Sequence, residues 1–376
     1  MRLTARQLNR ATLARQLLLR REPLDVVDAV RRVVALQAQE PASPYLALWN
    51  RIEDFDPADL DAAFANRTVV KASLIRLTLH AVDAEDYPAF HSAMLSSLRG
   101  SRLYDRRYTT SGLSTADADG VLPHLLTFAA RARSKSEIES LLADRLGGHN
   151  PRAWWALKMF APLHHVPTGG PWSYGTRGSF VAAPAIRAPA SPDASVRRLV
   201  LRYLDGFGPA SVKDFGQFTI LRRPVTVEAL NALGDEVVAR EGPDGEALFD
   251  VPEGLLPADD TPAPARLLPM WDSILLAYAD RSRVIPPDYR RLVIHQNGDV
   301  LPTLLVDGYV AGVWRTVEGG IEATAFHRLS TSDWKALAAE AAALVSFLAD
   351  RDPTVYRRYA HWWAKLPSAE VRVLPG

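Results

Sequence analysis

The run Leu36-Gln37-Ala38-Gln39-Glu40-Pro41 marks the point where a helix must end and the chain must open into an extended segment. Valines recur at helical spacing over the preceding residues 26–34, and Pro41 disfavours helical geometry at Glu40. Residues two apart share a face in an extended chain but not in a helix. We therefore expect Gln37 and Gln39 to face one cavity, with a pair of solvated residues at a helix end as the alternative.

A glutamine pair restricts the chemistry of such a cavity. The side-chain amide offers a carbonyl acceptor and an NH₂ donor, but it does not titrate. Gln37 and Gln39 are therefore suited to holding a water molecule or recognising a polar edge, and not to acid–base catalysis.

Around this run, the sequence predicts helices followed by strands. Thr4 and Gln7 have capping-box spacing at the start of one helix, Pro23 begins a second, and Asp56-Pro57 begins a third. The β-branched and aliphatic residues of 68–72 and 74–80 then predict strands. A short cluster of helices followed by strands is the pattern of a winged helix.

The same pattern recurs further along the chain. A second capping box at Ser134 opens another group of helices and strands, and a third unit runs from Val196 to Leu233. We therefore predict an α+β fold with tandem winged-helix motifs. The predicted segments are three winged-helix units over 1–115, 116–190 and 191–262, and a C-terminal β region with a hairpin and a terminal helix over 263–376.

The C-terminal region carries a strong hairpin signal. Asp307-Gly308 lies between the apolar runs 302–306 and 309–314, and this dipeptide between alternating apolar residues indicates a tight turn. Residues 292–294 predict a further strand, and the alanine-rich residues 333–348 predict a helix.

Composition narrows the class of protein. The chain has 376 residues, of which 48% are hydrophobic and 23% charged, as is ordinary for a soluble globular protein. It has no cysteine, which excludes disulfides, thiolate metal sites and cysteine catalysis. No window approaches 18 uncharged apolar residues, so no membrane span is expected. The first residues do not resemble a signal peptide, and we expect a cytoplasmic protein.

The net charge of +1 hides local clusters of arginine. Local basic patches rather than net charge bind phosphates, although solvated arginines scattered over helix faces are the alternative. The clusters are Arg99, Arg102, Arg106 and Arg107; Arg197, Arg198 and Arg202; and Arg281, Arg283, Arg290 and Arg291.

Three other groups have simpler interpretations. His164 and His165 are adjacent in a predicted strand and point to opposite faces, with no carboxylate at ligand spacing, so we expect no metal site. We expect Asp272 to cap a turn or to form a salt bridge near Arg281 or Arg283 rather than to act in catalysis. Four tryptophans are expected in the core rather than as stacking platforms for bases: Trp154, Trp155, Trp362 and Trp363.

Several motifs give the chain a resemblance, over essentially its whole length, to the winged-helix DNA glycosylases of the AlkZ and YcaQ type. The motifs lie, in order, at residues 36–39, 78–87, 203–210, 267–272 and 302–308. The AlkZ branch has a catalytic Gln-x-Gln pair where the YcaQ branch has Gln-x-Asp. Gln39 therefore places the resemblance nearer to the AlkZ branch.

The resemblance implies tandem winged-helix motifs in a concave arrangement that binds DNA. It also implies a monofunctional DNA glycosylase with Gln37 and Gln39 as its catalytic pair and with no metal or organic cofactor. The AlkZ branch is associated with self-resistance to azinomycin, which crosslinks DNA through purine N7. The implied partner is thus double-stranded DNA that contains an alkylated or crosslinked guanine, bound by a monomer. The implied roles are DNA repair and toxin self-resistance.

Expected DNA contacts fall into two groups. Arginine clusters would hold phosphates, and the tip of the predicted hairpin would enter a groove and report distortion. A structural wing packed on the C-terminal helix is the alternative for the hairpin. The expected DNA-binding residues are Arg99, Arg102, Arg106, Arg107, Arg281, Arg283, Val306, Asp307, Gly308 and Tyr309.

An N7-alkylated guanine makes physical sense of a site without a carboxylate. The alkylated base is cationic and leaves as a neutral molecule, so no strong general acid is needed. Two amide carbonyls can then orient the attacking water. A carboxylate would be a stronger base, and its absence predicts narrow selectivity for cationic lesions. A bulky lesion is hard to extrude into a pocket, so an open cleft would suit it better.

A winged-helix transcription regulator without catalysis is the alternative function. Three winged helices in one chain argue against the usual palindrome-reading dimer, which generally carries one per subunit. A regulator would also prefer one DNA sequence strongly over unrelated ones.

Overall fold

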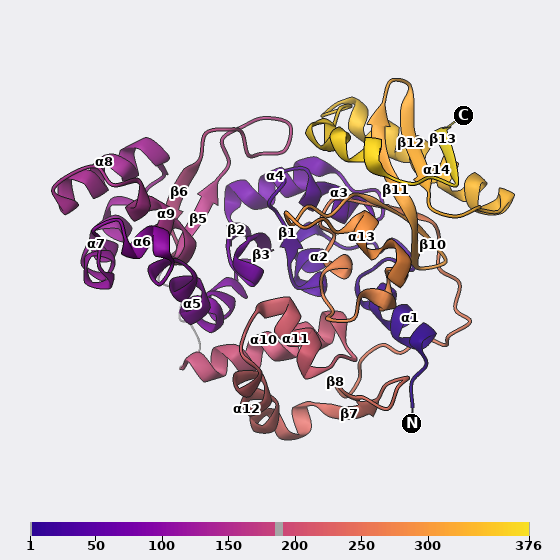
Figure 1. Ribbon diagram of the computed structural model, residues 1–376, viewed down its shortest axis with the longest axis horizontal. Helices are drawn as coiled ribbons and strands as arrows, with labels where there is room; N and C mark the ends of the chain where they lie inside the picture. Colours follow the sequence, from indigo (N-terminus) through magenta and orange to yellow (C-terminus); the bar gives the residue numbers. More distant parts are fainter. Residues whose placement is uncertain (1, 185–190, 376) are drawn as a thin grey trace.

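The computed structural model describes residues 2–184 and 191–375 and has the α+β class expected from the sequence. Figure 1 shows helices grouped around antiparallel sheets of six, five and two strands. The buried apolar side chains of all four predicted segments merge into one large core. None of the helices in the described ranges is long and apolar enough to cross a membrane.

The first part of the chain has the order helix, strand, helix, helix, strand, strand. Its elements are α2 (Val26–Val33), β1 (Leu36–Gln37), α3 (Ser43–Trp49), α4 (Pro57–Asn66), β2 (Val69–Ser73) and β3 (Leu79–Asp83). Strand β3 lies between β1 and β2, so the first strand pairs with the last. Helix α2 begins later than predicted because the Asp25 side chain, not Pro23, caps its N-terminus.

The turn between β2 and β3 is not the strand that the sequence predicts. Ile75–Leu77 form a 3-10 turn, η1, in which Arg76 and Leu77 have φ values of 51° and 59°. Left-handed backbone is unfavourable for residues with bulky side chains and often marks functional positions. The β-branched composition of this segment hid the turn.

The second unit repeats this order. Helices α5 (Tyr87–Leu103) and α6 (Arg106–Thr109) lead into α7 (Thr115–Phe128), β4 (Arg133–Ser134), α8 (Lys135–Leu146), α9 (Pro151–Phe160), β5 (Leu163–Val166) and β6 (Ser179–Ala182). The predicted capping box at Ser134 is confirmed at the start of α8. Pairing of β2 with β5 joins the two units into one sheet of order β1-β3-β2-β5-β6-β4.

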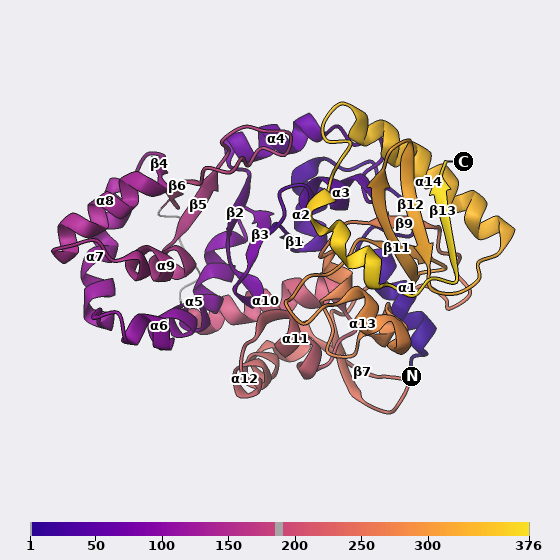
Figure 2. The same cartoon turned by 45° about the horizontal axis from the view of Figure 1, so that its top comes forward.

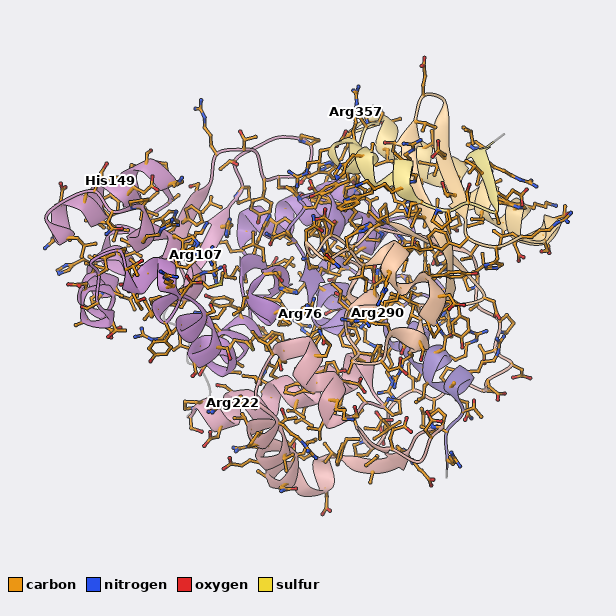
Figure 3. All side chains as sticks on the ribbon, viewed as in Figure 1. Arg76, Arg107, His149, Arg222, Arg290 and Arg357 are labelled. Atoms are coloured by element: carbon orange, nitrogen blue, oxygen red, sulfur yellow. The ribbon has the colours of Figure 1, made fainter. Side chains whose placement is uncertain are left out.

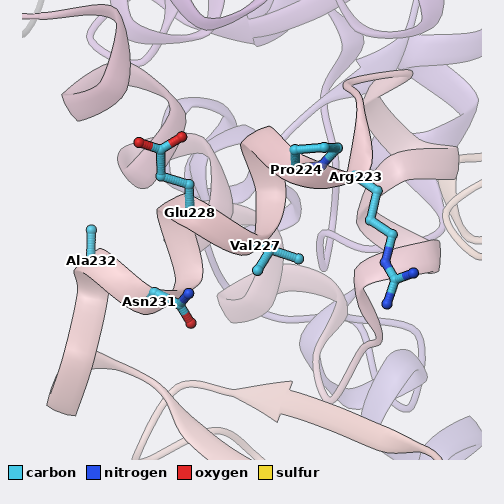
Figure 4. A pocket seen from close by; sticks show the side chains of 6 residues that line it. All are labelled: Arg223, Pro224, Val227, Glu228, Asn231 and Ala232. Atoms are coloured by element: carbon cyan, nitrogen blue, oxygen red, sulfur yellow. The ribbon is translucent and has the colours of Figure 1, made fainter.

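A third unit follows residues 185–190, which lie outside the described residues. It contains α10 (Pro192–Phe207), α11 (Val212–Thr219), α12 (Arg223–Leu233), η2 (Gly234–Glu236), β7 (Val238–Glu241) and β8 (Ala247–Asp250). Ala210 forms an isolated bridge to Phe249, in the place of the short first strand of the other units. Figure 4 shows a shallow hollow of about 800 Å³ whose six lining residues all come from α12, and it does not include the glutamine pair.

The C-terminal region forms a five-stranded sheet of order β13-β12-β11-β10-β9. Its strands are β9 (Arg266–Leu268), β10 (Thr303–Val306), β11 (Tyr309–Val317), β12 (Gly320–Ala325) and β13 (Glu370–Leu374), and α14 (Thr331–Ala349) packs against them. The predicted hairpin at Asp307-Gly308 is confirmed, with φ values of 47° and 80°.

One predicted strand in this region is wrong. Residues 290–293 form the short helix α13 (Arg290–Val293), which directly continues the 3-10 turn η5 (Pro287–Tyr289). The prolines that start η5 set helical φ values, and only Val293 of α13 is fully buried. Two further 3-10 turns are η3 (Ser273–Leu275) and η4 (Arg281–Arg283), and a longer one near the end is η6 (Arg357–Lys365).

Helix α1 (Ala5–Arg15) starts at the predicted capping box of Thr4 and Gln7. It packs against α10 and η4, so the N-terminal helix belongs spatially to the later parts of the chain. In Figures 1 and 2 the second unit, the third unit and the C-terminal region surround the first unit, and β1 lies near the centre of both views. This arrangement brings three parts of the chain around β1, the strand that contains Gln37, which we call the glutamine strand.

Candidate functional site

Strand β1 places the two glutamines at one edge of the six-stranded sheet. Val34 ends α2 with a φ of 73°, and the chain then pairs with β3, where Gln37 lies opposite His80. The Ala38 N–H continues this pairing by donating to the Leu79 carbonyl at 2.8 Å. The run is therefore extended at Leu36–Gln37, as predicted, and it bends at Gln39, with Gln37 buried and Gln39 exposed. That both side chains face one cavity stays a prediction.

Backbone donors hold both side-chain amides. The carbonyl oxygen of Gln37 accepts a hydrogen bond from the Gln39 N–H at 3.0 Å, and that of Gln39 accepts one from the Leu79 N–H at 3.2 Å. Because a backbone N–H requires an acceptor, these contacts fix which end of each amide is the oxygen. Each carbonyl keeps one lone pair. Within residues 2–184 and 191–375, neither NH₂ group has a recorded partner, so both remain for a ligand or water.

The nearest carboxylate in the sequence is already engaged. Glu40 forms an ion pair with Arg358, and the Tyr359 hydroxyl donates to the same carboxylate at 3.2 Å. The hydroxyls of Ser43 and Tyr356 lie 2.9 Å apart, which adds a second contact between these two segments. The end of the chain around η6 therefore closes over the turn that follows the glutamines, and Glu40 is held away from base chemistry.

His80 shares the sheet face of Gln37 and is buried. Its Nδ1 lies 3.2 Å from the Thr78 carbonyl oxygen, and its Nε2 is buried without a partner in the described part of the chain. Burial, with a smaller contribution from the nearby Arg76 guanidinium, lowers the pKa of His80 to about 3. The imidazole is therefore neutral at physiological pH.

The arginines of α5 and α6 form a patch around Trp155. The guanidinium groups of Arg102 and Arg107 lie 4.5 Å and 4.7 Å from its ring centroid, and Arg107 also pairs with Asp105 at 2.8 Å. Trp155 is half-buried beneath them, whereas Trp154 is buried as predicted. In Figure 3, Arg107 lies over this part of the molecule.

The two remaining arginines of this patch differ in availability. Arg99 pairs with Asp119 at 2.7 Å and lies over Phe160, with its guanidinium carbon 4.9 Å from the ring centroid. Arg106 is exposed and has no recorded ion pair among the described residues. Arg106 is therefore the arginine of this group that is freest to meet a phosphate.

The other arginine clusters are used in different ways. Arg198 and Arg202 both pair with the buried Asp86, at 2.7 Å and 3.0 Å, which makes them structural. In η4, Arg283 donates from Nη1 to the Pro209 carbonyl at 2.9 Å and lies 4.0 Å from the centroid of the Tyr278 ring. Arg281 makes no such contact, and its Nε and Nη1 are buried without partners in the described residues.

The hairpin tip is docked on the N-terminal helix. Asp307 forms ion pairs with Arg6, at 2.7 Å, and with the fully buried Arg10. The Gly308 carbonyl accepts a hydrogen bond from the Asn9 side chain at 2.8 Å. The tip therefore has the structural role that the alternative interpretation gave it, but it packs on α1 rather than on the C-terminal helix. Contact of Val306 to Tyr309 with DNA stays a prediction, and the ion pairs give the turn a structural role as well.

Asp272 has a structural role, as expected, but its partner is not one of the arginines that the sequence suggested. It forms a two-pronged salt bridge with Arg51 at 2.8 Å and 2.9 Å, and both side chains are fully buried. It also caps η3 by accepting from the Ile274 N–H. Arg281 and Arg283, which the sequence suggested, lie elsewhere. In the parts of the chain that the structure describes, no group of three His, Asp or Glu side chains is placed to hold a metal ion.

Sequence reasoning missed Arg76 and His80 as parts of this site. Neither lies in the glutamine run or in an arginine cluster, and the turn that contains Arg76 was predicted as strand. The available signal was position: both residues fall at or beside the motif at residues 78–87, which marks the strand that pairs with β1.

Comparison with known proteins gives three consistent results. A family model described as DNA glycosylase AlkZ-like matches residues 30–347. The chain is 25% identical, over 350 residues that cover 87% of this chain and 92% of the relative, to an interstrand DNA cross-link repair glycosylase of Streptomyces sahachiroi. It also superposes on the solved structure of the Streptomyces sahachiroi DNA glycosylase AlkZ with a TM-score of 0.80 and 23% identity, over 94% of this chain and 99% of that one.

The last result shows a shared fold, and the first covers well over half of the sequence. The match spans strand β1, the three arginine clusters and most of the C-terminal sheet. The chain therefore belongs to the AlkZ-like family of DNA glycosylases, which are hydrolases.

Proposed function

We propose that this protein is a monofunctional glycosylase that hydrolyses the N-glycosidic bond of N7-alkylated purines in double-stranded DNA. Its substrates include bulky and interstrand-crosslinked adducts of the azinomycin type, and its roles are DNA repair and self-resistance to such toxins. Gln37 and Gln39 are the proposed catalytic pair. The observation that carries the proposal is the locking of both amides by backbone donors at an open sheet edge.

The locked amides suit the positioning of one water molecule. Each carbonyl has a lone pair left to accept a proton of the water, and each NH₂ group can donate to the water or to the lesion. Because backbone groups hold both amides in place, little reorganisation is needed when the reaction occurs. The neighbouring carboxylate of Glu40 is neutralised by Arg358, so no strong base acts at this edge. Such a site favours leaving groups that are already activated by positive charge.

The three repeated units are the proposed means of holding DNA. We propose that each is a winged helix, because its first strand, or the Ala210 bridge in the third unit, pairs with its last strand. Phosphate contacts would come from the exposed Arg106, from the patch around Trp155 and from Arg281. Arginine contacts of this kind bind DNA without reading its sequence. One chain would bind as a monomer, since all three units lie in it.

A panel of single-lesion duplexes tests this proposal. We expect base release from N7-methylguanine and from an N7-linked crosslink, detected as strand breaks after alkali. No release is expected from hypoxanthine, a base that carries no charge. Equal release of the neutral lesion would contradict the argument from leaving-group charge. A regulator without catalysis would release neither base and would prefer one duplex sequence by more than about a thousandfold.

A further inference from the structure

Two arginines have guanidinium groups that the protein itself does not satisfy. Arg76 donates from Nη1 to the Phe218 carbonyl at 3.3 Å, but its Nη2 is buried without a partner. Arg281 has both Nε and Nη1 buried without partners. Buried guanidinium N–H groups are normally hydrogen-bonded, so each exception needs an explanation.

The two guanidinium groups also lack a neutralising carboxylate. Neither forms a salt bridge with any residue in the described ranges, and the nearby Asp214 has its oxygens engaged by Ser211 and by the Ala279 N–H. Burial lowers the pKa of both guanidinium groups to about 10. The positive charge of Arg281 contributes to the lower pKa of Arg76, and that of Arg290 contributes to the lower pKa of Arg281. An uncompensated buried charge destabilises a fold, so a negatively charged ligand that reached these groups would stabilise it.

Both arginines lie by α11, because Arg76 donates to the Phe218 carbonyl and the Ala279 N–H, two residues before Arg281, donates to Asp214. Arg76 connects this pair of arginines with the proposed catalytic glutamines. Arg76 lies in η1, three residues before Leu79, whose N–H holds the Gln39 carbonyl. Its guanidinium is close enough to His80, which lies opposite Gln37, to lower the histidine pKa. The left-handed backbone at Arg76 aims the side chain towards α11 and Phe218. Figure 3 shows Arg76 and Arg290 towards the middle of the molecule.

We propose that Arg76 and Arg281 form a binding site for a phosphodiester group of DNA, which holds the lesion-bearing strand beside Gln37 and Gln39. The site deepens the proposed function and rests on it for the identity of the ligand. Free guanidinium N–H groups from two side chains match the oxygens of one phosphate, and such charge-assisted hydrogen bonds are strong. Arg290, exposed on α13, adds charge at the rim. Free inorganic phosphate has the same chemistry and is the competing source.

The test replaces the phosphates around the lesion, one at a time, by an uncharged methylphosphonate and measures the affinity of the protein for each duplex. A duplex carries one 2′-fluoro N7-methylguanine, which resists base release, and one methylphosphonate at each position around the lesion in turn. We expect wild-type affinity to fall roughly tenfold at one position, as for the loss of a charge-assisted contact. The Arg76→Met/Arg281→Met variant should bind the unmodified duplex about tenfold more weakly and be insensitive to the methylphosphonate at that position. Arg328→Met, which removes an exposed arginine with no recorded ion pair, should keep the wild-type pattern.

A variant that keeps the wild-type sensitivity at every position overturns the proposal. The proposal is also overturned if the scan shows no coupling while inorganic phosphate stabilises the wild type and not the double variant, because the ligand is then the free ion. Coupling at one phosphate in a protein that releases no base from cleavable N7-methylguanine would leave the phosphate site standing and refute the catalytic proposal. The two failures are thus distinguishable.

Thermal unfolding supplies a second readout. The Arg281 side chain makes no recorded hydrogen bond in the described residues, so Arg281→Met should leave the Tm unchanged or raise it. Arg283, two residues away in the same turn, holds the Pro209 carbonyl, so Arg283→Met should lower the Tm. A fall for Arg281→Met as large as that for Arg283→Met would show that Arg281 is structural and would overturn its assignment to a phosphate.

Discussion

Replacing Asp272 by alanine should cost this protein much of its stability without removing its chemistry. Asp272 and Arg51 are fully buried and joined by hydrogen bonds of 2.8 Å and 2.9 Å. Removing one partner of a buried pair leaves an uncompensated charge, which costs about 3–5 kcal/mol. The lost cap on η3 adds about 1 kcal/mol. The total is a large fraction of the roughly 5–15 kcal/mol that stabilises a typical domain.

Chemical denaturation of four proteins measures this cost. The wild type, Asp272→Ala, Arg51→Leu and the Arg51→Leu/Asp272→Ala double variant form a cycle, and we expect the double variant to recover most of the loss because no charge is left buried. Base release per folded molecule should stay within a few-fold of wild type in Asp272→Asn. A loss below about 1 kcal/mol in Asp272→Ala, or a hundredfold loss of release in folded Asp272→Asn, would refute the structural role.

Three further predictions follow from individual contacts. Asp307→Ala should destabilise the fold by roughly 2 kcal/mol or more, because the fully buried Arg10 loses its carboxylate; denaturation unchanged from wild type would contradict this. Burial lowers the pKa of His80 and His165 to about 3, whereas an unfolded histidine titrates near 6.5, so the unfolded state binds more protons below that pH. The free energy of unfolding should therefore fall by several kcal/mol as the pH falls from about 6.5 towards 4, and less in His165→Phe; equal falls would refute the assignment. Arg106→Ala should lower the slope of log affinity against log salt by about 0.9 if Arg106 contacts a phosphate, and an unchanged slope would remove it from the interface.

Local signals in the sequence predicted local structure well. The capping boxes at Thr4 and Ser134 start helices as expected, because their hydrogen bonds involve residues only three apart. The Asp307-Gly308 pair forms the predicted hairpin, since both residues tolerate positive φ. Such elements depend on a few neighbouring residues, and a sequence window contains them all.

Elements that depend on their surroundings were predicted poorly. Apolar residues 292–294 have strand composition, yet the prolines at 286–287 start a helical turn that continues through Val293. Arg76 was placed in a strand because its neighbours are β-branched or aliphatic, while its left-handed conformation is imposed by the packing of η1 on α5 and α11. Periodicity and composition do not contain this information.

The candidate site shows the same division. The opening of the chain after α2 into the extended segment Leu36–Gln37 was predictable from the sequence. The donors that fix the two amides were not, because one comes from Leu79 on another strand. The partner of Asp272 is Arg51, 221 residues away along the chain. Only the fold shows which of many arginines reaches a given carboxylate.

The most direct test of the central claim is single-turnover base release by the Gln37→Ala/Gln39→Ala variant. Release from an N7-methylguanine duplex and affinity for that duplex are measured on the same preparation. If the two locked amides position the attacking water, release should fall by a factor of about 10² or more, towards the spontaneous rate. Affinity should stay within a few-fold of wild type, because phosphate contacts dominate binding. Release near the wild-type rate by a folded double variant would contradict the claim.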